Sequence, residues 1–491
     1  MRRFAPAAIA WAAAVTLAVI WLATRGSLEL NAIQLGAGIR LSLRLDAIGF
    51  ACSLATLVGG AGLLTLRPGE RWTLLLALAA ALLAINSDDL LFTAVAAGLA
   101  LLFVLEASGG GEGATWPLWA AVLLAAWAGV SLQVVGGTAG FGAAPPAALN
   151  AGIAGLVLLA AIGLVGAVPT GESWPPVAWV TMPPIGGSLL LRVFTLGNGL
   201  LPHAALYTAL ALVGLLVWGL AAWRAAVAAS GREFLLQSLP AMAGTTLLAA
   251  ASGVQLGAVA VVFALYATVL FAVLVATVAP RRRADMVIAA AVVAGLPPGL
   301  GFVAWLLAIQ AQLESDRALA WIVVPAALAW LLWMFAALRA LSLQPAGATA
   351  SRRLAHVLGA ISVLLGLGAG LVSAAIAQPA AATAGLSGKG PRLAAGLAGM
   401  APASGGWPAL VLGGVLVLAV VAAAGAGSTR LPAFSEPMPP LLPNLPRPRL
   451  PWPAPGLPGL PAAEALLSGR RPLLWAALIM ALAVFVTRAP L

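Results

Sequence analysis

Side chains that could bind, release or transfer a proton are rare in this sequence. Its 491 residues include 14 acidic residues, two histidines and one cysteine, and all 25 basic residues except Lys389 are arginines. An arginine stays protonated, so it can shape an electric field but cannot pass a proton on. The candidates for a proton path or an electrostatic role are Asp46, Glu106, Arg192 and Arg232.

For most of these candidates, a structural role such as capping or anchoring is the expected one. We expect Asp46 to cap the helix that follows it, because a side-chain oxygen can accept from the free amides of a first turn. Arg192 is expected to anchor at a membrane interface with its guanidinium reaching water. Glu106 precedes "SGGGEG" at a helix end, where solvation is the expected state. A buried, functional position is the alternative for each.

The sequence offers little to a metal ion, a cofactor or a catalytic centre. His203 and His356 are isolated, and the single Cys52 can form neither a disulfide nor a multi-cysteine metal site. We found no phosphate-binding loop, nucleophile elbow, zinc spacing or dinucleotide fingerprint. We therefore expect no metal and no cofactor, and at most a non-catalytic place in an enzyme complex.

The composition requires elements that lie in lipid. The chain is 62% hydrophobic and 8% charged, whereas soluble domains are about 25% charged. Continuous apolar runs of about 20 residues can cross a bilayer as helices. We predict an all-α integral membrane protein with about 14–15 spans, at 4–23, 47–66, 72–86, 89–107, 116–135, 149–168, 177–197, 203–228, 235–253, 255–279, 286–311, 318–343, 354–378, 407–427 and 472–488.

The basic residues indicate a topology rather than a nucleic-acid partner. They are scattered over short loops, and a cytoplasmic N-terminus places most of them on the cytoplasmic side, as the positive-inside rule requires. We expect a multi-pass protein of the cytoplasmic membrane, if the source is prokaryotic, with the lipid bilayer as its surroundings and no nucleic acid bound.

Three segments do not fit a membrane helix. Residues 27–46 alternate apolar and polar side chains, which predicts a short β-hairpin outside the bilayer. Residues 379–406 are rich in Ala, Gly and Ser and are expected to form a loop. Residues 431–461 carry a proline at every second or third position and favour an extended tether or a strap. The predicted divisions are 1–46 (first helix and hairpin), 47–345 (core), 346–430 (further helices and loop), 431–471 (linker) and 472–491 (last helix).

Five blocks in sequence carry a resemblance to a known family. They are "IRLSLRLDAIGFACSLATLVGGAGLL" (39–64), "NSDDLLFTAVAAGLALLFVLEA" (86–107), "WPPVAWVTMPPIGG" (174–187), "SGREFLLQSLPAMAG" (230–244) and "AGLPPGLGF" (294–302). In order and spacing, from about residue 35 to 345, they resemble the antiporter-like membrane subunits of respiratory NADH–quinone oxidoreductase (complex I) and of Mrp-type cation/proton antiporters.

The resemblance implies helices broken at membrane depth. Members of the family break helices with prolines beside glycines, so that loose backbone lines a buried polar track; such backbone is tolerated where protein surrounds it. The alternative is a simple turn between two helices. The residues that match the breaking motifs are Pro183, Pro184, Gly295, Pro297, Pro298 and Gly301.

The resemblance also implies titratable residues that this chain lacks. The family moves protons along buried lysines, glutamates and histidines, and buried lysines can have pKa values low enough to exchange protons near neutrality. Here the matching positions hold small or apolar residues or a threonine: Gly98 for the glutamate, and Val165 or Gly166, Thr268 or Val269, and Ala304 or Trp305 for the lysines.

These features favour one function and leave a second open. We expect a membrane subunit of a complex-I-like or antiporter-like assembly, with other membrane subunits as partners and a structural or coupling role. The alternative is an independent transporter of a neutral or weakly polar solute, bound by hydroxyl groups of Thr181, Ser188, Thr245, Thr246 and Thr268. A lipid-linked membrane enzyme would need a cluster of carboxylates or histidines at one face, which the loops do not supply.

Overall fold

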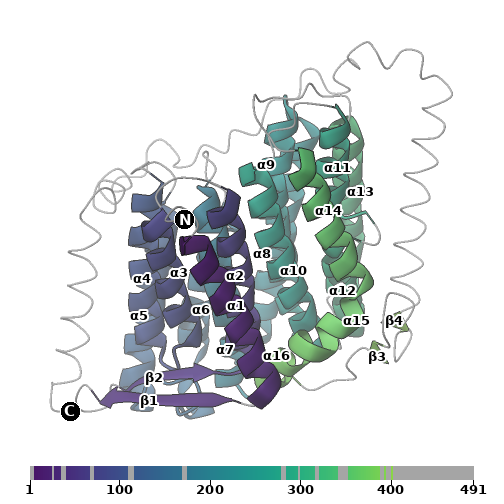
Figure 1. Cartoon of the computed structure of the whole chain (residues 1–491). Coiled ribbons are helices and arrows are strands. Elements are labelled where there is room, and N and C mark those ends of the chain that lie inside the picture. The colour runs from purple at the N-terminus through teal and green to yellow at the C-terminus, as the bar shows by residue number, and fades with distance from the viewer. Residues whose placement is uncertain are drawn as a thin grey trace, which may run out of the picture. The chain divides into compact units, whose positions relative to one another are not determined.

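The structure is a computed structural model, and its contacts divide the chain into two units. Of the residues that the structure describes, unit 1 comprises those up to residue 207 and 379–386, and unit 2 comprises those from 208 to 378 with 392–393 and 400–401 (Figure 1). The residues described are 5–24, 27–34, 40–66, 71–108, 115–168, 174–277, 283–296, 299–315, 320–340, 352–386, 392–393 and 400–401. The predicted spans 407–427 and 472–488 and the proline-rich segment 431–461 lie outside them.

Unit 1 consists mainly of helices that run up and down beside one another. Helix α7 is its central element and contacts α2, α3, α4 and α6. Its elements are α1 (Ala5–Thr24), β1 (Leu28–Gln34), β2 (Arg40–Leu45), α2 (Ala47–Leu66), α3 (Arg71–Asn86), α4 (Leu90–Ala107), α5 (Trp116–Gly136), the 3-10 turn η1 (Pro146–Ala148), α6 (Ala151–Val165), α7 (Pro176–Leu196), the start of α8 (Ala204–Ala226) and most of α16 (Gln378–Thr383).

The β-hairpin expected at 27–46 is present. Strands β1 and β2 pair antiparallel, with Glu29 opposite Arg44, and Figure 1 shows them lying across one end of the helices of unit 1. We call this the hairpin end. Opposite charges that face each other across two strands add to the pairing.

Capping side chains fix where several helices begin. The Asp89 carboxylate accepts from the amides of Leu91 and Phe92 at 2.8 and 3.1 Å and starts α4 at the hairpin end. Asn150 accepts from the Ile153 amide at 2.9 Å and starts α6. Each satisfies amides that the helix itself leaves unpaired. A short polar residue before an apolar run thus sets the boundary.

The predicted break at Pro183 and Pro184 is wrong. Helix α7 is continuous from Pro176 to Leu196 and contains both prolines. Two prolines remove two backbone donors, but their fixed φ is compatible with a helix. Gly186 follows, and a Cβ there would lie 2.7 Å from the Val165 amide nitrogen, so the absence of a side chain lets α6 and α7 pack closely. Packing against four other helices therefore favours a continuous α7.

Unit 2 has its own core around α9, α10 and α12, which contact one another. The indole of Trp333 donates to the Val293 carbonyl at 3.3 Å, and Arg339 donates to the Ala226 carbonyl. The elements of this unit are the rest of α8, α9 (Gly231–Ala251), α10 (Gln255–Thr277), α11 (Arg283–Ala294), α12 (Leu300–Glu314), η2 (Ala320–Ile322), α13 (Val323–Ala340), α14 (Arg352–Leu367), α15 (Ala369–Val372), the π-turn η3 (Ser373–Ala377), β3 (Arg392–Leu393) and β4 (Met400–Ala401).

The interruption expected around Gly295 is present. Helix α11 ends at Ala294 and α12 begins at Leu300. Gly295 has φ +67°, a conformation that favours glycine. Gly301 lies inside α12, where a Cβ would be 3.0 Å from Cζ of Phe271, so this glycine allows α12 to approach α10. Pro297 and Pro298 lie outside the described residues.

The chain differs from the prediction after residue 352. One membrane span was expected at 354–378, but the helix bends by 70° at Gly368. The part after the bend contains a short π-helix, Ser373–Ala377. The loop expected at 379–406 begins as helix, because α16 continues to Thr383. The Gly368 amide still bonds to the Leu364 carbonyl at 2.8 Å, so the bend lies at a helix end with its bonding intact.

The chain is an integral, multi-pass membrane protein with an all-α membrane domain. In the described part, eight helices are long and apolar enough to cross a membrane, or nine if the bent pair counts as one span. Shorter apolar helices accompany them at Trp72–Asn86, Ala151–Val165, Leu300–Glu314 and Val323–Ala337.

Candidate functional site: a buried ion pair at the hairpin end

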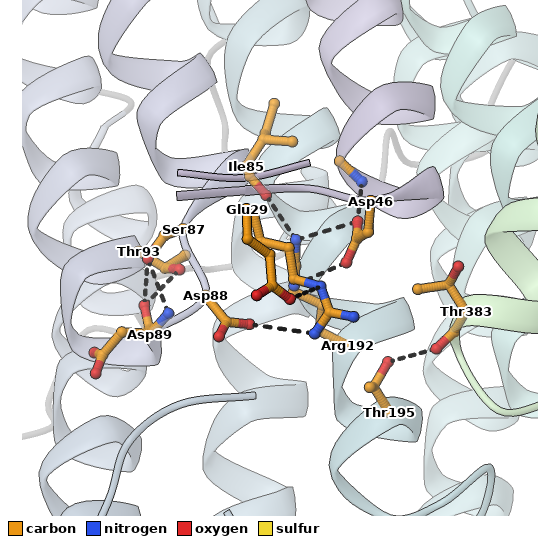
Figure 2. Close-up of polar contacts among 12 residues, drawn as sticks. Glu29, Asp46, Ile85, Ser87, Asp88, Asp89, Thr93, Arg192, Thr195 and Thr383 are labelled. Carbon is orange, nitrogen blue, oxygen red and sulfur yellow. Dashed lines mark hydrogen bonds and ion pairs between the residues drawn. The ribbon is translucent and has the colours of Figure 1, made fainter. Parts of the chain in front are cut away.

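Asp46 and Arg192 form a buried ion pair in unit 1. Arg192 Nη1 lies 3.4 Å from Asp46 Oδ2, and Nη2 lies 3.4 Å from Asp46 Oδ1 (Figure 2). The Arg192 side chain is 3% exposed and the Asp46 side chain is 5% exposed. Two parallel contacts between a planar guanidinium and a carboxylate give both geometric specificity and energy. Arg192 is therefore held by protein, and its expected role as an interfacial anchor reaching water is wrong.

Helix ends stabilise both charges. Asp46 precedes α2, and its Oδ1 accepts from the Gly49 amide at 2.7 Å, so the expected capping role is confirmed alongside the ion pair. Arg192 Nη2 also donates to the Ile85 carbonyl at 3.2 Å, in the last turn of α3. A helix N-terminus favours a negative charge and a C-terminus a positive one. The pair thus lies where two helix termini meet.

Loops and the hairpin close over the pair. The Asp88 amide donates to the Ser42 carbonyl of β2 at 3.0 Å, and the Phe141 amide donates to the Asp88 carbonyl at 2.8 Å. The Arg192 guanidinium carbon lies 5.1 Å from the centre of the Phe141 ring, within the range of a cation–π contact. The α3–α4 and α5–α6 connections therefore fix the depth and direction of Arg192.

A second set of charges leads from the pair toward the surface. Arg44 Nη1 lies 3.9 Å from Asp88 Oδ1, and Arg44 Nε lies 3.6 Å from Glu29 Oε1. The exposed fraction of the side chains rises from 21% for Asp88 to 29% for Arg44 and 58% for Glu29. Charges of alternating sign thus extend from the buried pair to the hairpin surface.

Burial changes the acidity of the two carboxylates between α3 and α4, both of which precede the α4 span. Burial raises the pKa of Asp88 from its ordinary value of 3.8, while Arg192 and then Arg44 oppose the rise. Burial also raises the pKa of Asp89, against the backbone hydrogen bonds from Phe92 and Leu91. Asp88 therefore keeps a proton at a higher pH than an exposed aspartate.

The structure does not bring the other candidates to this site. Glu106 is exposed near the end of α4, as expected, and Arg232 is exposed in the first turn of α9, in unit 2. In the part of the chain that the structure describes, no group of three or more His, Cys, Asp or Glu side chains could hold a metal ion.

Sequence reasoning missed the roles of Arg44 and Asp88. In the sequence, Arg44 is one polar position of the alternating segment 27–46, and Asp88 is the acidic residue before Asp89. The sequence indicated part of the role of Asp88. The letters "SDD" between two apolar runs are typical of a helix start, where one carboxylate caps the helix and the other can make another contact. Their partners could not be found, because the ion pairs join separate loops.

Comparisons with known proteins give matches in structure only. No protein-family model and no curated protein matches the sequence. A chain of the Mrp complex from Dietzia sp. is similar over 100% of this chain, with 21% sequence identity and a TM-score of 0.71; this chain spans 58% of that chain's length.

Two respiratory complexes also contain similar chains. In complex I from Thermus thermophilus the similarity covers 79% of this chain and 96% of the other, with 18% identity and a TM-score of 0.61. In the membrane-bound sulfane sulfur reductase, an archaeal respiratory membrane complex, it covers 76% of each chain, with 16% identity and a TM-score of 0.58. The chain therefore has the fold of the antiporter-like membrane subunits of Mrp and complex-I-type assemblies.

Proposed function

We propose that this chain is a membrane subunit of a larger assembly of the complex-I or Mrp type, in which it supplies structure or coupling and carries no lysine-based proton path of its own. The fold it shares with chains of multi-subunit membrane complexes supports the assembly. Since a fold alone does not fix a function, the role of the chain is argued from its buried residues.

The distribution of buried charge carries the proposal. In the described residues, the buried charged side chains are Asp46, Asp89 and Arg192, and all three lie at the hairpin end of unit 1. The buried polar side chains described in unit 2 are serines, threonines and glutamines, such as Gln312, whose Nε2 donates to the Leu248 carbonyl at 2.5 Å. None of these types takes up a proton near neutral pH.

In unit 1, the positions that correspond to titratable residues of the family contact side chains of neighbouring segments. A Cβ at Gly98 would lie 3.4 Å from Val122 Cγ1 and 3.8 Å from the Trp119 ring. Val165 is 1% exposed, and Gly166 has φ +90° with the Trp179 ring 2.5 Å from where a Cβ would be. A long side chain at Gly166 would be strained and would have no room.

In unit 2, the corresponding side chains are also buried and make contacts within the protein. The Thr268 hydroxyl donates to the Ala264 carbonyl of its own helix at 2.8 Å. Trp305 is 1% exposed; its ring stacks on Trp330 with centroids 4.6 Å apart and meets the edge of Trp218 at 6.1 Å. Three aromatic rings therefore fill the region where the family would place a lysine after the helix break.

These observations support a passive membrane core. A proton needs groups that bind and release it, and a charge inside a membrane is costly without such partners. A chain whose buried charges, in the described residues, lie at the hairpin end of unit 1 can still transmit change, because its helices contact one another within each unit. Structural support or coupling between neighbours is the role that remains.

The hydroxyls of the alternative function are committed to the backbone. Thr181, Ser188, Thr245 and Thr246 donate to carbonyls of their own helices, at 2.9, 2.8, 3.0 and 2.9 Å. Their protons are therefore not offered to a solute, although their oxygens can accept. This favours the subunit over an independent transporter of a neutral solute.

Isolation from native membranes tests the proposal. A tagged chain extracted in a mild detergent is expected to elute with other multi-pass subunits in fixed proportion, and to release them when the detergent is made harsher. Elution as a stable single chain that takes up a neutral solute after reconstitution would contradict it.

A further inference from the structure

Unsatisfied polar atoms gather at the hairpin end of unit 1. Arg44 Nε, Asn86 Oδ1, Asp88 Oδ1 and Arg192 Nε are buried and have no hydrogen-bond partner among the residues that the structure describes. Buried polar atoms in proteins are nearly always paired with protein or with ordered water. Arg44 Nε and Asp88 Oδ1 have ion-pair contacts at 3.6 and 3.9 Å, longer than hydrogen bonds. Four atoms without a hydrogen bond at one site therefore indicate bound water, which typically makes two to four hydrogen bonds to groups of this kind.

Two glycines keep the backbone close to these atoms. A Cβ at Gly142 would lie 2.9 Å from Arg44 Nη1 and 3.9 Å from Asp88 Oδ1. A Cβ at Gly49 would lie 2.5 Å from Asn86 Oδ1 and 3.3 Å from Asp46 Oδ1. The orphan oxygen of Asn86 thus lies beside the same glycine as the carboxylate that binds Arg192. The charges of Arg192 and Asp46 also act on Asp88, which joins the charges near the surface to the buried pair in one polar region.

Exposure falls steadily along this region. The side chains of Glu29, Arg44, Asp88, Asp46 and Arg192 are 58%, 29%, 21%, 5% and 3% exposed. The polar side chains of this region thus run from the exposed surface of the hairpin to the buried Arg192.

We propose that this region is a blind, water-holding well, in which Asp88 exchanges a proton with the aqueous phase on the hairpin side and Arg192 prevents passage beyond. This goes beyond the proposed function and does not depend on it. Asp88 is the titratable group at intermediate depth, and the orphan atoms are the sites that hold water around it.

The charges around Asp88 fit this role. It is faced by Arg44 from β2, Glu29 from β1, Arg192 from α7 and Asp46 before α2, and Asp89 follows it at the start of α4. Burial raises the pKa of Asp88 and the two arginines limit the rise. Arginine provides a fixed positive charge in proteins, and such a charge in a polar region repels protons.

Infrared difference spectroscopy tests proton exchange at Asp88. The full chain in sealed vesicles of each orientation is titrated on one side only, and the carbonyl band of a protonated carboxyl group is followed. We expect the component of the band that belongs to Asp88 to respond to pH on the hairpin side, to be missing from Asp88→Asn and to remain in Asp89→Asn, where asparagine still caps α4. Arg44→Gln should move the midpoint to higher pH, and Glu29→Gln to slightly lower pH.

Hydroxyl-radical footprinting tests the water. Radicals formed from bound water oxidise side chains beside it, so Phe141, which is 2% exposed, should be oxidised. Phe263 in unit 2, which is 0% exposed, is the dry control and should not be. The proposal is overturned if Phe141 is as inert as Phe263, if Asp88→Asn leaves this component of the band in place, if the component follows pH on the opposite side, or if Arg44→Gln leaves the midpoint unchanged.

Discussion

The guanidinium of Arg192 binds the carboxylate of Asp46 although 146 positions separate them in the sequence. The contact joins the start of α2 to the final third of the central helix α7, and Arg192 also holds the last turn of α3 through the Ile85 carbonyl. One buried charge pair thus fixes three helices at the end of unit 1 where the hairpin lies.

Removing one partner of this ion pair should destabilise the fold more than removing both partners. Arg192→Met or Asp46→Asn alone leaves one buried charge without its partner, and we expect a loss of about 3–5 kcal/mol in the free energy of unfolding. The double variant leaves no unpaired charge and should recover most of that loss. Unfolding in mixed micelles, analysed as a double-mutant cycle, measures the coupling; additive losses would contradict the interaction.

The close approach at Gly49 predicts a steric effect. Gly49→Ala places a methyl group 2.5 Å from Asn86 Oδ1 and should destabilise unit 1 by about 1–3 kcal/mol. Gly155→Ala is the matched control, because a Cβ at this helical glycine of α6 meets nothing within 4 Å. It should be neutral or should stabilise by about 0.5–1 kcal/mol. Equal effects of the two variants on thermal unfolding would argue against the packing described.

The stacked tryptophans of unit 2 predict a cavity effect. Trp305→Ala removes a ring that is 1% exposed and stacked on Trp330, and it should cost about 3–5 kcal/mol. Trp321 is 51% exposed, so Trp321→Ala should change stability by no more than about 0.5 kcal/mol. Thermal unfolding followed by the remaining tryptophan fluorescence distinguishes them; a mild effect at Trp305 would mean that the cluster is loosely packed.

The partly buried carboxylate of Asp88 should make the stability of the fold depend on pH. Because burial raises its pKa above 3.8 in the folded chain, the folded state keeps a proton that the unfolded state has released. This contribution to stability is complete below pH 3.8 and is lost as the pH rises through the raised pKa. The melting temperature of Asp88→Asn, relative to wild type, should therefore increase as the pH is raised from 3.8.

A control variant separates this effect from a change in net charge. Glu106→Gln removes one negative charge at an exposed helix end and should leave the pH profile of melting as it is in the wild type. A profile of Asp88→Asn that runs parallel to the wild type would show that Asp88 is not responsible.

Local patterns in the sequence predicted most of the fold. Apolar runs located the helices, alternation located the hairpin at 27–46, and the glycine at 295 marked an interruption, because each signal depends on neighbours in the chain. The continuity of α7 through Pro183 and Pro184 could not be predicted, because packing against four other helices overrides the local cost of proline.

The site depended on contacts between distant residues. The capping role of Asp46 follows from its place before an apolar run, and it was predicted. Its pairing with Arg192, and the contact of Asp88 with Arg44, follow from how separate loops meet at the hairpin end. An arginine near a helix end reads the same whether it reaches water or turns inward, so the sequence favoured the wrong environment for Arg192.

Proton flux through reconstituted vesicles tests the central proposal, that the buried core of the described residues offers no chain of titratable groups across the membrane. The purified chain is placed in liposomes with an internal pH-sensitive dye, and an imposed pH gradient is followed with a potassium-clamped membrane potential. We predict decay no faster than in empty liposomes, with rapid collapse after a protonophore. Proton flux well above that of empty liposomes, from the wild-type chain alone, would contradict the account.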